Sequence, residues 1–146
     1  MFAPSREQAR RFFFETWRRY RAGEPLEGLE RTALEVIVLH PEYHSVLDRP
    51  QQHLDRDYPP EEADLNPFLH LSLHLAVAEQ LAIDQPPGVR RLFERLRETL
   101  ASEHDALHVV LECLGETIWQ SQRRGQPPDE SVYLDCLRQR LERDRA

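Results

Sequence analysis

Helix start and stop signals recur along this chain, and they constrain the fold more than any other feature. Ser5, Asn66 and Ser102 are capping residues at the start of stretches whose apolar residues have helical spacing. Gly23 and Gly125 follow two of the periodic stretches, where a helix commonly ends. The signals predict helices at about residues 5–22, 25–40, 66–83, 88–100, 102–124 and 130–142. We therefore expect an all-α fold, a helical bundle of five or six helices around one core.

Residues 69–75 also carry a pattern that is typical of a strand, because leucine alternates there with other residues. Leucine is not β-branched, the apolar segment is long, and no hairpin partner lies nearby. Apolar residues cover most of the circumference of the expected helix. We therefore predict a central buried helix here rather than a strand.

Pro41 interrupts the second predicted helix, since proline ends or kinks a helix and disfavours helical geometry in the residue before it. His40 is expected to end one helix, and Pro41 to open a short one that carries His44. Residues 47–65 are rich in proline and are expected to form the longest irregular stretch. His53, within that stretch, is expected to be exposed.

Composition narrows the class of protein. The 146 residues fit a single domain, 1–146, and 40% hydrophobic with 31% charged residues is a globular balance. A net charge of -7 argues against a nucleic-acid partner. No apolar run is long enough to cross a membrane, and the start lacks the pattern of a signal peptide. No CxxC spacing occurs, so neither a zinc knuckle nor a thioredoxin-like motif is supported. Cys113 and Cys136 are expected to be reduced and structural, and two free thiols suit a reducing compartment, so we expect a cytoplasmic protein. A homo-oligomer and the identity of any small-molecule substrate stay open.

Six of the seven histidines form pairs four residues apart: His40/His44, His70/His74 and His104/His108. Chance would give roughly 0.3 such pairs at this histidine content. On a helix, a spacing of four puts both side chains on one face, so that both imidazoles can reach the same ion. None of the pairs has the glutamate of the HExxH protease motif.

The pairs also lie on the apolar stripes of their predicted helices. A buried imidazole needs a polar partner, and bound metal would be the common partner of all six imidazoles. Glu112 follows His108 by four residues and extends that pair with a carboxylate. Six imidazoles and a carboxylate exceed the four ligands of one tetrahedral zinc ion. We therefore predict a buried site for two divalent ions of iron, zinc or manganese, with the ligands His40, His44, His70, His74, His104, His108 and Glu112.

The function that this pattern predicts is metal binding, with redox or oxygen chemistry or metal-assisted hydrolysis as the reactions open to it. No nucleophile motif, phosphate-binding loop or dinucleotide fingerprint occurs, so no catalytic residue is assigned and enzyme activity stays open. The alternative is a metal-free protein–protein interaction module with core histidines. In that case the aromatic helix at residues 12–20 would bind a partner or a second copy.

Residues 4–8, 40–44, 66–88 and 112–116 carry a resemblance to an uncharacterised proteobacterial helical family, domain-of-unknown-function family 1841. The likeness covers nearly the whole chain and implies no activity. More distantly, His104/His108 resembles the HxxxH helix of haemerythrin-like metal-binding bundles, whose HxxxE helix is replaced here by another HxxxH pair. The dipeptide His104-Asp105 is similar to the HD signature of metal-dependent phosphohydrolases, which requires a further aspartate downstream; Asp129 and Asp135 are available.

Overall fold

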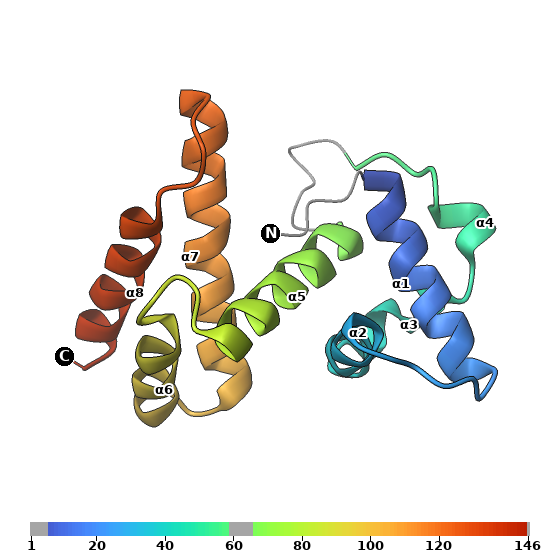
Figure 1. The fold of residues 1–146 in the computed structure, drawn as a ribbon, viewed down its shortest axis with the longest axis horizontal. Coiled ribbons are helices and arrows are strands. Elements are labelled where there is room, and N and C mark those ends of the chain that lie inside the picture. The colour runs from blue at the N-terminus through green and yellow to red at the C-terminus, as the bar shows by residue number, and fades with distance from the viewer. Residues whose placement is uncertain (1–5, 59–65, 146) are drawn as a thin grey trace. The chain divides into compact units, whose positions relative to one another are not determined.

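The computed structural model describes residues 6–58 and 66–145. Within these ranges all regular structure is helical and no strand occurs, so the predicted all-α fold class is confirmed. Six of the helices have ten residues or more, and three short elements lie between the second and third of these. In chain order the elements are α1 (Arg6–Arg21), α2 (Leu29–Val38), η1 (Pro41–Tyr43), α3 (His44–Leu47), α4 (Pro50–His53), α5 (Pro67–Ile83), α6 (Val89–Thr99), α7 (Glu103–Arg124) and α8 (Glu130–Arg145), as labelled in Figure 1.

The capping residues that the sequence pointed to do cap helices. The side-chain oxygen of Asn66 accepts hydrogen bonds from the backbone N–H groups of Phe68 and Leu69 at 3.0 and 3.2 Å. Ser102 accepts one from the N–H of Asp105 at 3.1 Å. These bonds satisfy N–H groups that have no partner within the helix. The cap predicted at Ser5 lies outside the described residues.

Two boundaries differ from the prediction. The second helix begins at Leu29 rather than near residue 25, because Gly28 precedes it with a φ of 56°, in the left-handed region that favours glycine. Of the predicted irregular stretch 47–65, the structure describes residues 47–58, and these contain a short helix, α4, which has Pro50 at its first turn. As predicted, α2 ends before Pro41 and a separate short helix follows.

The chain divides into two compact units, Met1–Leu75 and Ala76–Ala146, and the boundary falls within α5. Each unit is described by itself, and the single domain expected from the sequence stays a prediction. In the first unit, Leu71 is fully buried whereas Leu69, two residues earlier, is 42% exposed. A strand would place both leucines on the same face, so the helical interpretation of residues 69–75 is confirmed. The core of this unit includes Phe13, Phe14, Trp17, Ala33, Val36, Ile37, Leu47, Phe68, Leu71 and Leu75.

In the second unit, α7 and α8 lie side by side (Figure 1) and α6 packs against both. Its buried residues include Val89, Leu92, Phe93, Leu96, Val110, Leu114, Leu137 and Leu141. The buried hydroxyl of Tyr133 donates to the side-chain oxygen of Gln80 at 2.7 Å, and burial raises its pKa. The second unit therefore has an apolar core of its own.

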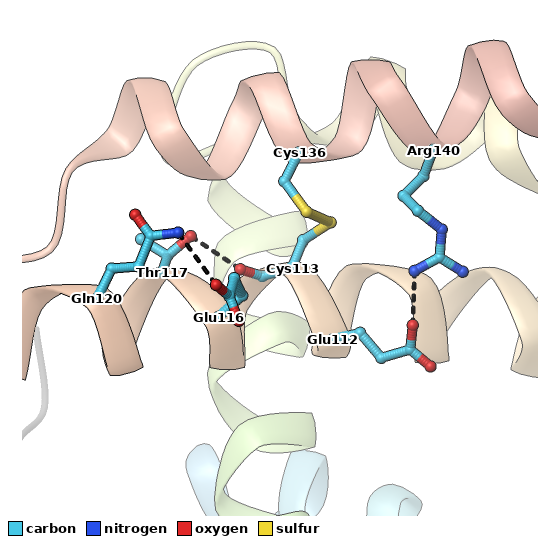
Figure 2. Close-up of a disulfide and its surroundings, with 7 residues drawn as sticks. All are labelled: Glu112, Cys113, Glu116, Thr117, Gln120, Cys136 and Arg140. Atoms are coloured by element: carbon cyan, nitrogen blue, oxygen red, sulfur yellow. Dashed lines mark hydrogen bonds and ion pairs between the residues drawn. A yellow bond between two sulfur atoms is a disulfide. The ribbon is translucent and has the colours of Figure 1, made fainter.

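A disulfide joins α7 to α8, and the prediction of two reduced thiols was wrong. Figure 2 shows the bond between Cys113 and Cys136, whose Cα atoms lie 5.7 Å apart. The two cysteines are 23 residues apart, and they meet because the turn after α7 brings α8 back alongside it. The argument for a reducing compartment that rested on two free thiols therefore falls.

None of the helices in the described ranges is long and apolar enough to cross a membrane.

Candidate metal centre

Three of the predicted ligands come together in the first unit. His40 lies between α2 and η1, and His70 and His74 lie one turn apart on α5. The ring centroids form a nearly equilateral triangle, with sides of 4.9 Å for His40–His70, 4.6 Å for His40–His74 and 4.8 Å for His70–His74. Each ring offers a nitrogen within 4.8 Å of the others, so the three could hold a metal ion. His40 and His74 are buried, and His70 is half-buried.

A hydrogen bond to the backbone determines which nitrogen His40 can offer. Its Nδ1 lies 2.8 Å from the carbonyl oxygen of Val36. A carbonyl oxygen only accepts, so Nδ1 carries the hydrogen and the Nε2 of the neutral ring has a lone pair. That Nε2 lies 3.1 Å from the Nε2 of His70. Metal-binding histidines commonly donate their other ring N–H to such a carbonyl, which fixes the ring and raises its basicity.

The spacing of the two Nε2 atoms suits ligands of one ion. Tetrahedral coordination with zinc–nitrogen bonds of about 2.0–2.1 Å puts neighbouring ligand nitrogens about 3.3 Å apart. The separation of 3.1 Å between His40 and His70 is close to that value. Imidazole ligands suit zinc, iron, copper or nickel, whereas manganese prefers oxygen ligands. Manganese, one of the metals expected from the sequence, therefore fits these three residues less well.

The ring of Tyr43 covers part of the triangle. It stacks on His40 with a centroid distance of 5.6 Å and an interplanar angle of 7°, and its edge contact with His70 measures 6.0 Å. Burial, with a smaller effect from Glu42, raises the pKa of Tyr43, so the phenol is neutral at physiological pH. A neutral aromatic side chain thus packs against two of the three imidazole rings.

His44 makes different contacts from His40, although the two residues form one of the predicted pairs. Its Nε2 lies 3.0 Å from the carbonyl oxygen of Ile37, and its ring lies 4.4 Å from that of Trp17. The pair does not share one helix face, because the chain turns at Pro41 between them. The ligand role of His44 stays a prediction.

The third histidine pair lies on α7 in the second unit. The ring centroids of His104 and His108 are 4.2 Å apart, and both residues are half-buried. Their side chains therefore share a helix face, as the spacing predicted. Their participation in a site with the other histidines stays a prediction.

Glu112 is engaged with another helix of the same unit. Its carboxylate accepts a hydrogen bond from Arg140 on α8 at 2.6 Å, and its side chain is 63% exposed (Figure 2). The HxxxHxxxE spacing suggested that Glu112 is a metal ligand. Its ion-pair partner, Arg140, lies 28 residues away, and local sequence patterns do not reveal such a distant contact. The ligand role of Glu112 stays a prediction, and this contact gives it no support.

Arg10 is a buried residue whose role was not predicted from the sequence. Its guanidinium donates from one nitrogen to the carbonyl oxygens of His53, Leu54 and Arg56 at 3.2, 3.0 and 2.6 Å. It also lies 4.7 Å from the ring centroid of Phe68, at the start of α5. Arg10 thus ties the chain after α4 to the helix that carries His70 and His74. The available signal was an arginine on the same helical stripe as the buried Phe13 and Phe14.

A groove of about 820 Å³ also lies in the first unit, between α1 and the α3–α4 segment. Its lining includes Trp17, Arg18 and Asp48, but none of the three clustered histidines. Arg18 is paired there with Glu15, and Asp48 accepts a hydrogen bond from the indole of Trp17. These charged groups thus have partners within the unit, and the candidate centre is the histidine triangle.

Comparison with known proteins identifies a family and no characterised relative. No curated protein and no solved structure matches the chain significantly. The likeness to haemerythrin-like bundles therefore stays an expectation from the sequence. One family matches over residues 5–139, nearly the whole chain. This chain belongs to the family described as domain of unknown function (DUF1841).

Proposed function

We propose that this protein binds a divalent transition-metal ion through His40, His70 and His74. The observation that carries the proposal is the triangle of imidazoles with sides of 4.6 to 4.9 Å. The hydrogen bond from His40 to the carbonyl of Val36 adds to it, because it leaves one ring nitrogen with a lone pair beside His70.

Two kinds of chemistry are open to such an ion. A zinc ion held by neutral imidazoles keeps its positive charge and lowers the pKa of bound water, which suits hydrolysis. Iron or copper in the same ligand set suits redox or oxygen chemistry. The identity of the metal therefore decides between the two classes of reaction.

The remaining predicted ligands bear on the number of ions. A second ion would need His44, His104, His108 or Glu112, because one ion uses the three clustered imidazoles. The sequence-based prediction of a dinuclear site is retained as part of the proposal. A metal-to-protein ratio of two in the purified chain supports it, and a ratio of one contradicts it.

The direct test is a metal count by inductively coupled plasma mass spectrometry on purified, dialysed protein. We expect bound zinc, iron, copper or nickel in the wild type and its loss in His70→Ala and His74→Ala. His53→Ala is the matched control, since His53 is a half-buried histidine of the same unit outside the triangle. Circular dichroism checks that each variant is folded. Full metal content in both triangle variants would rule out the site.

A metal-free interaction module is the second candidate, and one observation favours it. Both ring nitrogens of His40 lie within hydrogen-bonding distance of a partner, Val36 on one side and His70 on the other. A buried histidine that is satisfied in this way does not require an ion. Wild-type protein that contains no metal, and takes none up on titration, would support this candidate.

A further inference from the structure

We infer that the carboxyl end of α2 decides which histidine of the His40–His44 pair binds the ion, and through which nitrogen. This inference rests on the proposed metal site and describes it at the level of atoms. The structure assigns His40 as a ligand through Nε2 and His44 as a positioning residue. It also assigns to His70 a change of tautomer when metal binds.

The first step concerns the carbonyl groups at the end of α2. The last four carbonyls of a helix lack the usual N–H partner four residues later. The N–H of His40 turns to the carbonyl of Ile37 at 3.0 Å, which leaves the carbonyl of Val36 for another donor. The residue four after Ile37 is Pro41, which has no N–H to give. Both carbonyls therefore have room for a side-chain donor.

The two histidines fill these places with different ring nitrogens. His40 donates from Nδ1 to Val36 at 2.8 Å, whereas His44 donates from Nε2 to Ile37 at 3.0 Å. His40 is left with a lone pair on Nε2, the atom that lies 3.1 Å from His70. His44 uses its Nε2 for the helix end, and its ring packs on Trp17. His44 thus acts on the site by holding the helix end from which His40 projects.

The contact between His40 and His70 gives the next step. Two nitrogens 3.1 Å apart form a hydrogen bond only if one of them carries a hydrogen. The Nε2 of neutral His40 carries none, so in protein prepared without metal the Nε2 of His70 is the donor. An ion that binds both Nε2 atoms takes the place of that hydrogen. The proton of neutral His70 then moves to Nδ1 through solvent, with no net gain or loss of protons.

The experiment is ¹⁵N NMR of the histidine rings at neutral pH, in chelator-treated protein and after titration with zinc sulfate alone. Without zinc, we expect hydrogens on Nδ1 of His40, Nε2 of His44 and Nε2 of His70. With zinc, His70 should lose its Nε2–H and gain an Nδ1–H, while His40 and His44 keep their tautomers. His40→Gln, His44→Gln and His70→Gln assign the signals.

Zinc affinity of the same variants separates a ligand from a positioning residue. His40→Gln should lose more than about 100-fold in affinity, beyond the loss typical of an outer hydrogen-bond partner. His44→Ala should weaken binding, and His44→Gln should restore it, because the glutamine amide can still donate to Ile37. Rescue by glutamine at residue 44 but not at residue 40 is the result that supports the inference.

The outcomes also separate this inference from the proposed function. Zinc that binds while His40 carries its hydrogen on Nε2, or while His44→Gln binds as weakly as His44→Ala, overturns the inference and leaves the metal site standing. Zinc that does not bind to wild type overturns both. An Nε2–H on His40 in the metal-free protein contradicts the hydrogen bond from its Nδ1 to Val36, on which the inference depends, whether or not zinc binds.

Discussion

At the scale of single residues, buried polar side chains are matched by specific backbone acceptors. The hydroxyls of Thr16 and Thr117 donate to the carbonyls of Phe12 and Cys113, both at 2.8 Å. His40 does the same with Val36 through its Nδ1. Burial of a polar group is costly without such a bond, so each of these side chains is restricted to one orientation. His40 is restricted in this way before any ion binds.

His53 departs from this pattern, and it provides a prediction about pH. His53 was expected to be exposed, but it is half-buried, and its Nδ1 is buried with no hydrogen-bond partner among the described residues. Burial, assisted by the positive charges of Arg56 and Arg49, lowers its pKa from 6.5. The unfolded chain therefore takes up a proton here more readily than the folded chain does. The free energy of unfolding should be at its full value above the unfolded pKa and fall as the pH drops toward the folded pKa.

The measurement is urea unfolding of wild type and His53→Gln at about pH 8 and pH 5, the range in which histidine titrates. A chelator in every sample keeps metal release out of the comparison. We expect a smaller loss of stability between the two pH values in the variant than in the wild type. An equal loss in both proteins would show that His53 contributes nothing to the pH dependence.

At the scale of helices, the ends carry as much information as the apolar faces. Pro41 cannot donate a backbone hydrogen bond, so α2 ends before it and exposes carbonyl groups to His40 and His44. Asn66 fixes the start of α5 and hence where His70 and His74 lie on its surface. The end of α2 and the start of α5 thus position the three histidines of the triangle.

The disulfide between α7 and α8 leads to a prediction about the stability of the second unit. A cross-link over a separation of 23 residues restricts the unfolded chain, which in the chain-entropy model is worth about 3 kcal/mol of stability. Urea unfolding with and without tris(2-carboxyethyl)phosphine should show a loss of that order on reduction. The double variant Cys113→Ala, Cys136→Ala should not respond to the reductant. Two free thiols titrated in unreduced, denatured wild type would contradict the pairing.

At the scale of the whole molecule, each compact unit carries one of the two tryptophans, Trp17 in the first and Trp119 in the second. Trp17 is buried in the first core, whereas Trp119 is 51% exposed. Trp119→Phe therefore leaves a single fluorescent reporter in the unit that carries the triangle, at little cost in packing.

This reporter allows a test of what metal does to stability. An ion that binds only the folded state adds about 2.7 kcal/mol when free metal is 100 times its dissociation constant. We expect zinc to move the unfolding transition of Trp17 to higher urea in Trp119→Phe, and a chelator to reverse the shift. Adding His74→Ala should abolish the response. A zinc-induced shift that persists in the His74→Ala background would place the stabilising ion elsewhere.

Much of the fold was determined by the sequence alone, because the responsible interactions are local. A cap at Asn66 or Ser102 acts within three residues, and a proline acts on its own turn of chain. Helical spacing also predicted that His70 and His74 share a face. The helical class, most helix boundaries and the break at Pro41 could therefore be read from one sequence.

Tertiary structure alone decided which distant side chains meet. His40 and His70 are 30 residues apart, Glu112 and Arg140 are 28 apart, and Cys113 and Cys136 are 23 apart. Periodicity shows which face of a helix is apolar, but the neighbour that covers this face depends on how the helices pack. The spacing of His40 and His44 suggested equal roles, and the turn at Pro41 gave them different partners. The histidine motif thus came from local spacing, whereas the choice of His40, His70 and His74 came from packing.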